Sequence, residues 1–364
     1  MNIAPFNTIG KEEEEAVLRV IRSGKLSGYV ALKEGGGAEV SALEYEFGHC
    51  FGTMATAVNS ATSGLLAACM AASVAPGHEV IVSPLTMSAT FAVPAVLGAK
   101  IVFCDTEPDT FNMDVMKASS LITENTRAII VPNMFGCPAD LHFLRALCDS
   151  HNIIMIEDNA QSIMARENGV YAGTIGHMGV FSFNVHKHMQ CGEGGMVVTA
   201  DADLDTAIRW AMNHGEMRNG AFGLNLRMTE ITAAIAREQL KKLPGIVKRR
   251  QEIGERFTDN VYKHHLDDLL APQRVKQGKE PVYYAWAALN KEYDRSPWAM
   301  RVCNAQMLPF SNRYNCLIPD NGTVPIAFST ADRLFISETC AIDPTDEEID
   351  EIFEKLASMT RTVT

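Results

Sequence analysis

The chain has 364 residues, of which 47% are hydrophobic and 21% are charged, so it is long enough for one large domain with a smaller companion. Its formal net charge is -12, and it has no basic run beyond the short cluster at residues 248–250, which argues against a nucleic-acid partner. No apolar run approaches the roughly 18 residues of a membrane-spanning helix and the acidic N-terminus lacks a secretory signal, so a soluble, cytoplasmic protein is expected.

The first half of the chain alternates between short apolar strands and helices. An amphipathic helix is predicted for residues 11–23, where apolar residues recur at helical spacing before Gly24, and a glycine-containing loop follows to residue 37. Strands are then predicted at 55–58, 79–83, 100–103, 127–131 and 153–156, and helices at 62–73, 88–97 and 139–150. This alternation predicts an α/β fold with a mostly parallel sheet covered on both faces, in which ligands bind beyond the carboxyl ends of the strands.

The second half is dominated by longer helices. They are predicted at residues 203–213, 230–240 and 245–262, and the Leu243-Pro244-Gly245 sequence is predicted to be a hinge. A large cofactor-binding domain would therefore occupy residues 1–244, and a smaller C-terminal α+β domain residues 245–364. A strand at 282–289 and a closing helix at 346–357 are expected in the smaller domain, against which the N-terminal helix could pack.

Metal and disulfide sites are not expected. The nine cysteines are irregularly spaced and form no CxxC pair. An odd number in a long chain is typical of reduced thiols in a cytoplasmic protein.

The most informative stretch is residues 178–199, MGVFSFNVHKHMQCGEGGMVVT, which places Lys187 between an apolar strand and the glycine cluster at 192–195. A lysine that loses its charge can form a Schiff base with a carbonyl, and an amine used in this way needs a depressed pKa. The glycines let the backbone turn tightly, although GEGG is not a dinucleotide-binding fingerprint. A lone lysine is more often an exposed, normally titrating side chain, so the neighbouring residues decide its role.

Three further groups follow predicted strands and would meet Lys187 at one edge of the sheet. Ala61 and Thr62, in the NSATSG turn, offer backbone N–H groups and the positive end of a helix dipole to a phosphate; a plain N-cap is the alternative. Asp158 follows a buried strand and must be paired to stay charged, which a protonated ring nitrogen would achieve; a helix-capping aspartate is the alternative. Ser182, five residues before Lys187, could bind the same phosphate or cap a turn.

Together these residues resemble a known family. The segment SFNVHKHMQCGEGG is similar to the catalytic-lysine segment of the DegT/DnrJ/EryC1/StrS family of pyridoxal-phosphate-dependent sugar aminotransferases. The segments NSATSGLLAA, VIVSPLTMSATFAVPAVLGA, VPNMFGCPADL, IEDNAQS and GLNLRMTEITAAIAREQL resemble other family motifs in the same order, over roughly residues 5–243. The resemblance implies the aspartate aminotransferase-like fold type I, with a large, mostly parallel sheet flanked by helices and a smaller C-terminal α+β domain.

The resemblance also implies a role for each matched residue. Lys187 would form the internal aldimine with pyridoxal phosphate and carry the proton, with pyridoxamine phosphate as the intermediate form of the cofactor. Asp158 would pair with the pyridinium nitrogen, and Gln161 would lie near the 3-hydroxyl. Ser182 and the NSATSG turn would hold the phosphate.

Asn225, in GLNLRM, matches an asparagine that in this family reaches the phosphate of the other subunit's cofactor, so the resemblance implies a homodimer with a shared active site. Met87 stands where the family usually stacks an aromatic ring on the cofactor, and a thioether packs without the same stacking. Asn184 stands where the family commonly has histidine or another aromatic residue. The chain beyond about residue 272 matches the family poorly.

The spacing of the motif around Lys187 distinguishes an aminotransferase from a dehydratase. One branch of the family replaces the lysine with histidine and acts as a dehydratase, and His186 and His188 flank Lys187. The five-residue step from Ser182 and the four residues before Gly192 both select Lys187. The implied function is an aminotransferase of amino-sugar or polysaccharide biosynthesis that moves an amino group from glutamate to a keto-sugar, expected to be nucleotide-linked. The alternatives are a sugar dehydratase of the same family and a non-catalytic, cofactor-binding regulatory protein.

Overall fold

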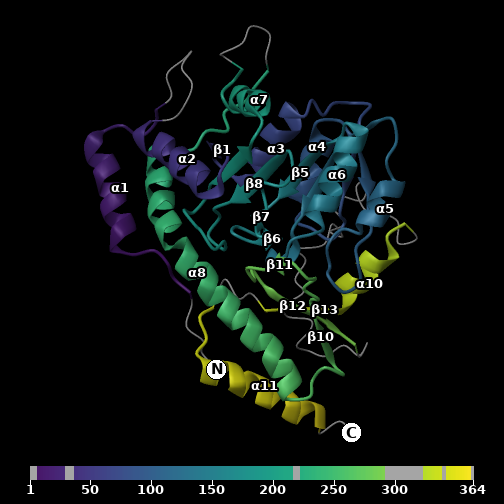
Figure 1. Ribbon diagram of the computed structural model, residues 1–364. Helices are drawn as coiled ribbons and strands as arrows, with labels where there is room; N and C mark the ends of the chain where they lie inside the picture. The colour runs from purple at the N-terminus through teal and green to yellow at the C-terminus, as the bar shows by residue number, and fades with distance from the viewer. Residues whose placement is uncertain (1–5, 29–36, 216–221, 292–322, 338–341, 362–364) are drawn as a thin grey trace.

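The computed structural model describes residues 6–28, 37–215, 222–291, 323–337 and 342–361, and its centre is a seven-stranded sheet (Figure 1). The strand order is β1-β9-β8-β5-β4-β2-β3. The strands are β1 (Met54–Val58), β2 (Glu79–Val82), β3 (Lys100–Phe103), β4 (Thr126–Pro132), β5 (Ile154–Asp158), β8 (Met178–Ser182) and β9 (Gly195–Thr199). Only β9 runs antiparallel to its neighbours, β1 and β8. The carboxyl ends of β1, β5 and β8 therefore share one edge with the first residue of β9, which confirms the expected mostly parallel sheet.

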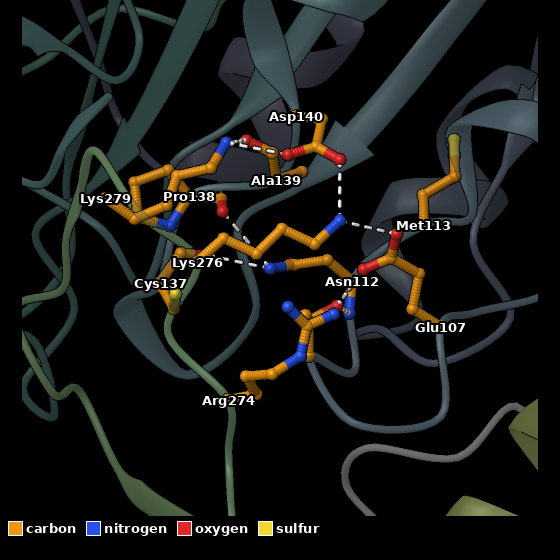
Figure 2. A pocket seen from close by; sticks show the side chains of 11 residues that line it. Glu107, Asn112, Met113, Cys137, Pro138, Ala139, Asp140, Arg274, Lys276 and Lys279 are labelled. Atoms are coloured by element: carbon orange, nitrogen blue, oxygen red, sulfur yellow. Dashed lines mark hydrogen bonds and ion pairs between the residues drawn. The ribbon is translucent and has the colours of Figure 1, made fainter. Parts of the chain in front are cut away.

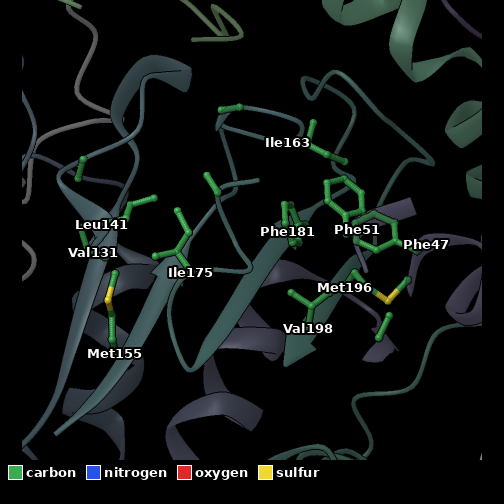
Figure 3. Close-up of a cluster of buried hydrophobic side chains, with 14 of the residues drawn as sticks. Phe47, Phe51, Val131, Leu141, Met155, Ile163, Ile175, Phe181, Met196 and Val198 are labelled. Atoms are coloured by element: carbon green, nitrogen blue, oxygen red, sulfur yellow. The ribbon is translucent and has the colours of Figure 1, made fainter. Parts of the chain in front are cut away.

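Helices cover both faces of this sheet, because successive strand residues point to opposite sides. On β4, Ala128 and Ile130 belong to one buried cluster and Ile129 and Val131 to the other. The first cluster packs against α3 (Ala61–Ala71), α4 (Ala89–Val96) and α7 (Ala202–Met212). The second, drawn in Figure 3, packs against α2 (Ala38–Phe51), α5 (Val115–Ser120), α6 (Leu141–His151) and the first half of α8 (Glu230–Lys263).

Helix α2 occupies a segment that the sequence pattern leaves as a connection between the glycine-rich loop and β1. Its buried face carries Val40, Leu43 and Phe47 at helical spacing. The N-cap residue is a glycine with no side chain to accept a hydrogen bond, and the carboxylate of Glu230 accepts the N–H groups of Gly37 and Glu39 at 2.9 and 2.7 Å instead. A residue far along the chain therefore supplies the cap that local sequence does not.

Helix α8 corrects the hinge expected at Leu243-Pro244-Gly245, because it runs as one 34-residue helix through Pro244 (Figure 1). Proline removes one helical hydrogen bond and crowds the preceding turn. Packing on both sides of Pro244 offsets this cost: Ala16 and Val20 of α1 (Lys11–Ser23) pack against Ala234, and α11 (Asp346–Arg361) packs against the other half. One continuous helix thus spans the boundary expected at residue 244, and α1 packs against the half that precedes it.

The C-terminal part contains a small sheet of β10 (Leu270–Pro272), β12 (Trp286–Asn290) and β13 (Leu334–Ser337), with α10 (Pro325–Arg333) beside it. The strand expected at 282–289 begins only at Trp286, because Tyr283 has a φ of 47°, outside the range of any strand. A second small sheet joins β11 (Lys279–Glu280) to β6 (Arg166–Glu167) and β7 (Val170–Tyr171). The chain beyond residue 270 is thereby tied to the large sheet's connections.

Within the described ranges, no helix is both long and apolar enough to cross a membrane. The cysteines placed there are free thiols, namely Cys50, Cys69, Cys104, Cys137, Cys148 and Cys191. Cys303, Cys316 and Cys340 lie outside the described residues. Burial raises the pKa of Cys69 and Cys137 to about 12, so these two thiols stay protonated at neutral pH.

Candidate active site

The end of β1, the start of α3 and the β8–β9 pair meet at the shared edge of the sheet. Ala61 and Thr62 are the first two residues of α3, and the hydroxyl of Ser60, its N-cap, accepts the N–H of Ser63 at 3.1 Å. Ser182, the last residue of β8, pairs with Gly195, the first residue of β9. The first turn of a helix leaves its N–H groups without helical acceptors, so this corner presents donors to an anion.

Gly195 is needed for this arrangement. A Cβ at its position would lie 2.8 Å from the Ala61 nitrogen and 2.7 Å from the Phe181 carbonyl oxygen. The absence of a side chain therefore lets β9 approach the start of α3, which brings Ser182 and the α3 N-terminus together. The expectation that Ser182, Ala61 and Thr62 gather at one place is supported by this register.

Asp158 ends β5 as a buried carboxylate with 7% of its surface exposed. Its Oδ2 accepts the Thr90 hydroxyl at 2.8 Å, and its Oδ1 accepts the Ala160 N–H at 3.2 Å. Burial raises the pKa of Asp158, while the hydrogen bonds from Thr90 and Ala160 and the charge of Lys187 act in the opposite direction. A positive group placed against this carboxylate would keep it ionised.

Lys187 lies half-buried in the connection between β8 and β9. Its N–H donates to the Asn184 carbonyl at 2.9 Å, and its Nζ lies 4.1 Å from the centre of the Tyr284 ring. Its charge lowers the pKa of Asp158, so the amine lies within electrostatic range of that carboxylate.

The two flanking histidines have different surroundings. His186 is exposed. His188 is buried, with Nε2 2.8 Å from the Val282 carbonyl oxygen, and burial lowers its pKa to about 4. His188 is therefore neutral at physiological pH and held by the backbone, whereas the amine of Lys187 lies against the Tyr284 ring and its charge acts on Asp158.

Three further residues predicted to contact the cofactor are Gln161, Met87 and Asn225. The Gln161 Oε1 accepts the Phe135 N–H at 2.7 Å, which holds the side chain in place. Met87 is 54% exposed in the turn before α4. Asn225 is exposed, and its neighbour Leu226 accepts the N–H of Asn59 at 2.8 Å, which places this segment beside the start of α3.

Two residues that contact the predicted site residues cannot be identified from the sequence alone. Thr90 lies in the first turn of α4, where a threonine is an ordinary helix residue, and only the fold shows that it hydrogen-bonds Asp158. Tyr284 lies inside the expected strand, about one hundred residues from Lys187. No spacing connects either residue with the lysine.

A small pocket lies elsewhere, between the segments that follow β3 and β4 and the segment that precedes β11 (Figure 2). Lys276 bridges Glu107 and Asp140 there, at 2.6 and 2.7 Å. None of the predicted site residues lines it. Since its cations are paired with acids, this pocket is an ionic junction between the C-terminal part and the large sheet. In the described part of the chain, no group of three or more His, Cys, Asp or Glu side chains could hold a metal ion.

Comparison with known proteins places the chain in a family. Residues 7–302 match the model of the DegT/DnrJ/EryC1/StrS aminotransferase family. The spore coat polysaccharide biosynthesis protein SpsC of Bacillus subtilis is 34% identical over 265 residues, 68% of this chain and 66% of SpsC. GDP-perosamine synthase of Escherichia coli O157:H7 is 33% identical over 237 residues, 64% of this chain and 63% of that enzyme. The chain thus spans less than two thirds of the length of these two relatives.

The structural similarity covers more of the chain than the sequence similarity does. The X-ray structure of an aminotransferase from Psychrobacter cryohalolentis is 26% identical, with a TM-score of 0.89 over 99% of both chains. This agreement confirms the predicted fold type I, with its mostly parallel sheet flanked by helices. The chain belongs to the DegT/DnrJ/EryC1/StrS aminotransferase family.

Proposed function

We propose that the protein is a pyridoxal-phosphate-dependent aminotransferase that moves an amino group from glutamate to a nucleotide-linked keto-sugar. The observation that carries this proposal is the convergence of Lys187, the buried Asp158 and the α3 N-terminus at one edge of the sheet, in a chain of this family. The names of the relatives, a GDP-perosamine synthase and a spore coat polysaccharide protein, support a sugar substrate and a role in amino-sugar or polysaccharide biosynthesis.

The residues present fit the cofactor. Asp158 is a buried carboxylate whose pKa burial raises, so a protonated ring nitrogen would offset its desolvation. The corner of Ser182 and the α3 N-terminus, kept open by Gly195, suits a phosphate. Gln161, fixed by the Phe135 N–H, would contact the ring's 3-hydroxyl. When bound, the cofactor would supply an electron sink for the charge released on breaking a C–H bond.

The work of the chain's own groups follows from their positions. Asp158 would hold a proton on the ring nitrogen through charge and hydrogen bonding, oriented by Thr90. Lys187 would hold the cofactor covalently and, once released, move a proton between two carbon atoms as a neutral amine. The thioether of Met87 would lie against the cofactor ring where relatives use an aromatic side chain.

We further propose a homodimer with a shared site and an intracellular, cytoplasmic location. Asn225 is exposed, as a residue that contacts a partner subunit must be before assembly, and the family resemblance assigns it to the phosphate of the partner's cofactor. We also propose that residues 1–244 form the large cofactor-binding domain and residues 245–364 the small C-terminal domain. The helix α8, which belongs to both, would connect them without a break.

A spectroscopic experiment tests the function. The purified protein should absorb in the visible range of a lysine-linked cofactor, glutamate should bleach that band, and Lys187→Ala should abolish it. His186→Ala, a change at the exposed neighbouring residue, should leave the band and the bleaching intact. An unchanged spectrum after glutamate is added would contradict the amino-donor assignment.

The second half-reaction is tested with a panel of nucleotide-linked keto-sugars. Turnover should release 2-oxoglutarate and yield a product that has gained nitrogen. A product that has lost water without gaining nitrogen would support the sugar dehydratase instead. Cofactor binding without turnover on any member of the panel would favour a regulatory protein.

A further inference from the structure

The tripeptide Val282-Tyr283-Tyr284 is hydrogen-bonded through Val282 to two segments of the large sheet's connections, one after β4 and one after β8. The Val282 N–H donates to the Gly136 carbonyl at 2.9 Å, and the Val282 carbonyl oxygen lies 2.8 Å from Nε2 of His188. Gly136 has a φ of 90°, and a Cβ there would lie 2.8 Å from the Tyr284 nitrogen. A glycine is therefore required at position 136, because only a residue without a side chain lets the backbone of Tyr284 approach this closely.

The two tyrosines have different neighbours because the backbone bends between them. Tyr283 has a φ of 47°, and its ring packs so closely on Gly254 of α8 that a Cβ there would come within 2.3 Å of it. The next residue, Tyr284, instead places its ring 4.1 Å from Nζ of Lys187 and 6.3 Å from the ring of His188. The bend at Tyr283 and the close packing at Gly136 and Gly254 thus place the Tyr284 ring against the Lys187 amine.

We infer that Tyr284 is a positioning residue, whose ring face holds the free side chain of Lys187 in its ammonium form beside Asp158. A cation within about 6 Å of an aromatic ring centre is attracted to the ring face. This inference rests on the proposed function, in which the released neutral amine of Lys187 becomes an ammonium group each time it accepts a proton from carbon and before it passes that proton on.

The charges around Lys187 agree with this role. Asp158 attracts the ammonium group. His188 carries no competing charge at neutral pH, because burial lowers its pKa to about 4. The attraction of the Tyr284 ring therefore adds to that of one carboxylate, without an adjacent imidazolium to oppose it.

The test uses the full-length chain freed of cofactor, so that it does not depend on turnover. Lysines are labelled competitively with acetic anhydride over a range of pH, and the extent of labelling at Lys187 is read by peptide mass spectrometry. In Tyr284→Leu, the midpoint pH of Lys187 labelling should fall by about half a unit to one unit relative to the parent protein. Tyr284→Phe, which retains the ring face, should match the parent.

Matched controls make the outcome decisive. Tyr262→Leu removes an exposed tyrosine from α8 and should leave the midpoint unchanged. If Tyr284→Leu does not fold by circular dichroism, Tyr284→Met supplies a side chain of similar length without a ring face and should show the same fall. A midpoint equal to that of the parent in a folded Leu or Met variant overturns the inference. A protein that shows the shift but has no aminotransferase activity would refute the proposed function and retain the positioning role.

Discussion

The Thr90 hydroxyl donates a hydrogen bond to Asp158 Oδ2 at 2.8 Å and thereby joins the first turn of α4 to the end of β5. Thr86 lies 2.8 Å from the same hydroxyl, so a chain of two threonines ends on the buried carboxylate. Since Thr90 donates to Asp158, it accepts from Thr86. The pair fixes one oxygen of Asp158 and leaves the carboxylate oriented for a cation.

Replacing Thr90 with valine should weaken cofactor binding by about tenfold to a hundredfold, because a hydrogen bond to a charged acceptor contributes about 1.5–3 kcal/mol. Valine retains the shape of threonine and removes only the donor. Equilibrium titration with pyridoxal phosphate, followed by absorbance, measures the change. Thr86→Val is the matched control and should have a smaller effect, since Thr90 still donates to Asp158. Equal losses in the two variants would show that the threonines act through packing.

The ionisation of Asp158 should lower the stability of the cofactor-free protein as pH rises, and Asp158→Asn should remove that contribution. Burial raises the pKa of Asp158 above its value in the unfolded chain. Between those two values the native state binds more protons than the unfolded state, so the free energy of unfolding falls with rising pH. Above the native value the full penalty of the buried charge remains.

Urea unfolding at several pH values from 4 to 8 tests this dependence. As pH rises, the free energy of unfolding of the Asn variant should increase relative to that of the parent, while the variant binds the cofactor less tightly. Asp268→Asn, at an exposed position, should leave the slope unchanged. A slope in Asp158→Asn as steep as that of the parent would show that Asp158 does not titrate in this range.

Lys279→Met should destabilise the protein by about 3–5 kcal/mol, the usual cost of removing one partner from a buried ion pair. The side chain of Lys279 is 4% exposed and pairs with Asp140 at 3.0 Å and with Glu167. Without the lysine, Glu167 keeps a buried and poorly compensated charge. Lys276→Met should cost less, because Lys276 is 25% exposed and water can replace it. Denaturant unfolding compares the two variants, and similar losses would contradict this reading of their burial.

Gly195→Ala should weaken cofactor binding and lower the free energy of unfolding by about 1–3 kcal/mol. The new Cβ would lie 2.8 Å from the Ala61 nitrogen and must push the start of α3 away from β9. Gly245→Ala is the control, since its Cβ meets no atom within 4 Å and lies inside α8. Alanine there should stabilise the helix by up to about 1 kcal/mol. Calorimetry and cofactor titration measure the two changes, and tight cofactor binding by Gly195→Ala would argue against the α3 N-terminus as the phosphate site.

Asp105→Ala should loosen α10 without disturbing the large sheet. The buried Asp105 carboxylate accepts the N–H groups of Ile326 and Ala327 at 3.1 and 2.7 Å, so it caps α10 from the connection after β3. Loss of a helix cap costs about 1 kcal/mol, and amide exchange at Ile326 and Ala327 should accelerate by about fivefold. Asp114→Ala, which uncaps α5, should accelerate exchange at its own helix and leave α10 unchanged. Equal exchange at α10 in the parent and Asp105→Ala would refute the cap.

Local sequence predicts those elements whose shape depends on nearby residues. The first helix, Lys11–Ser23, and the strand Lys100–Phe103 have the bounds expected from their apolar spacing and flanking residues. The motif around Lys187 likewise identifies the family, because the types and spacing of its residues are visible in one dimension. The parallel sheet follows from the alternation of strand and helix.

Contacts between distant residues decide the rest. Helix α2 receives its cap from Glu230, and α8 continues through Pro244 because packing against α1 and α11 outweighs the lost hydrogen bond. In the same way, the sequence by itself determined that Lys187 is the candidate reactive group, whereas only the tertiary structure placed Thr90 on Asp158 and Tyr284 against the lysine. Hydrogen bonds and ring contacts act over a few ångströms of space, and residues separated by a hundred positions share that space only after the chain has folded.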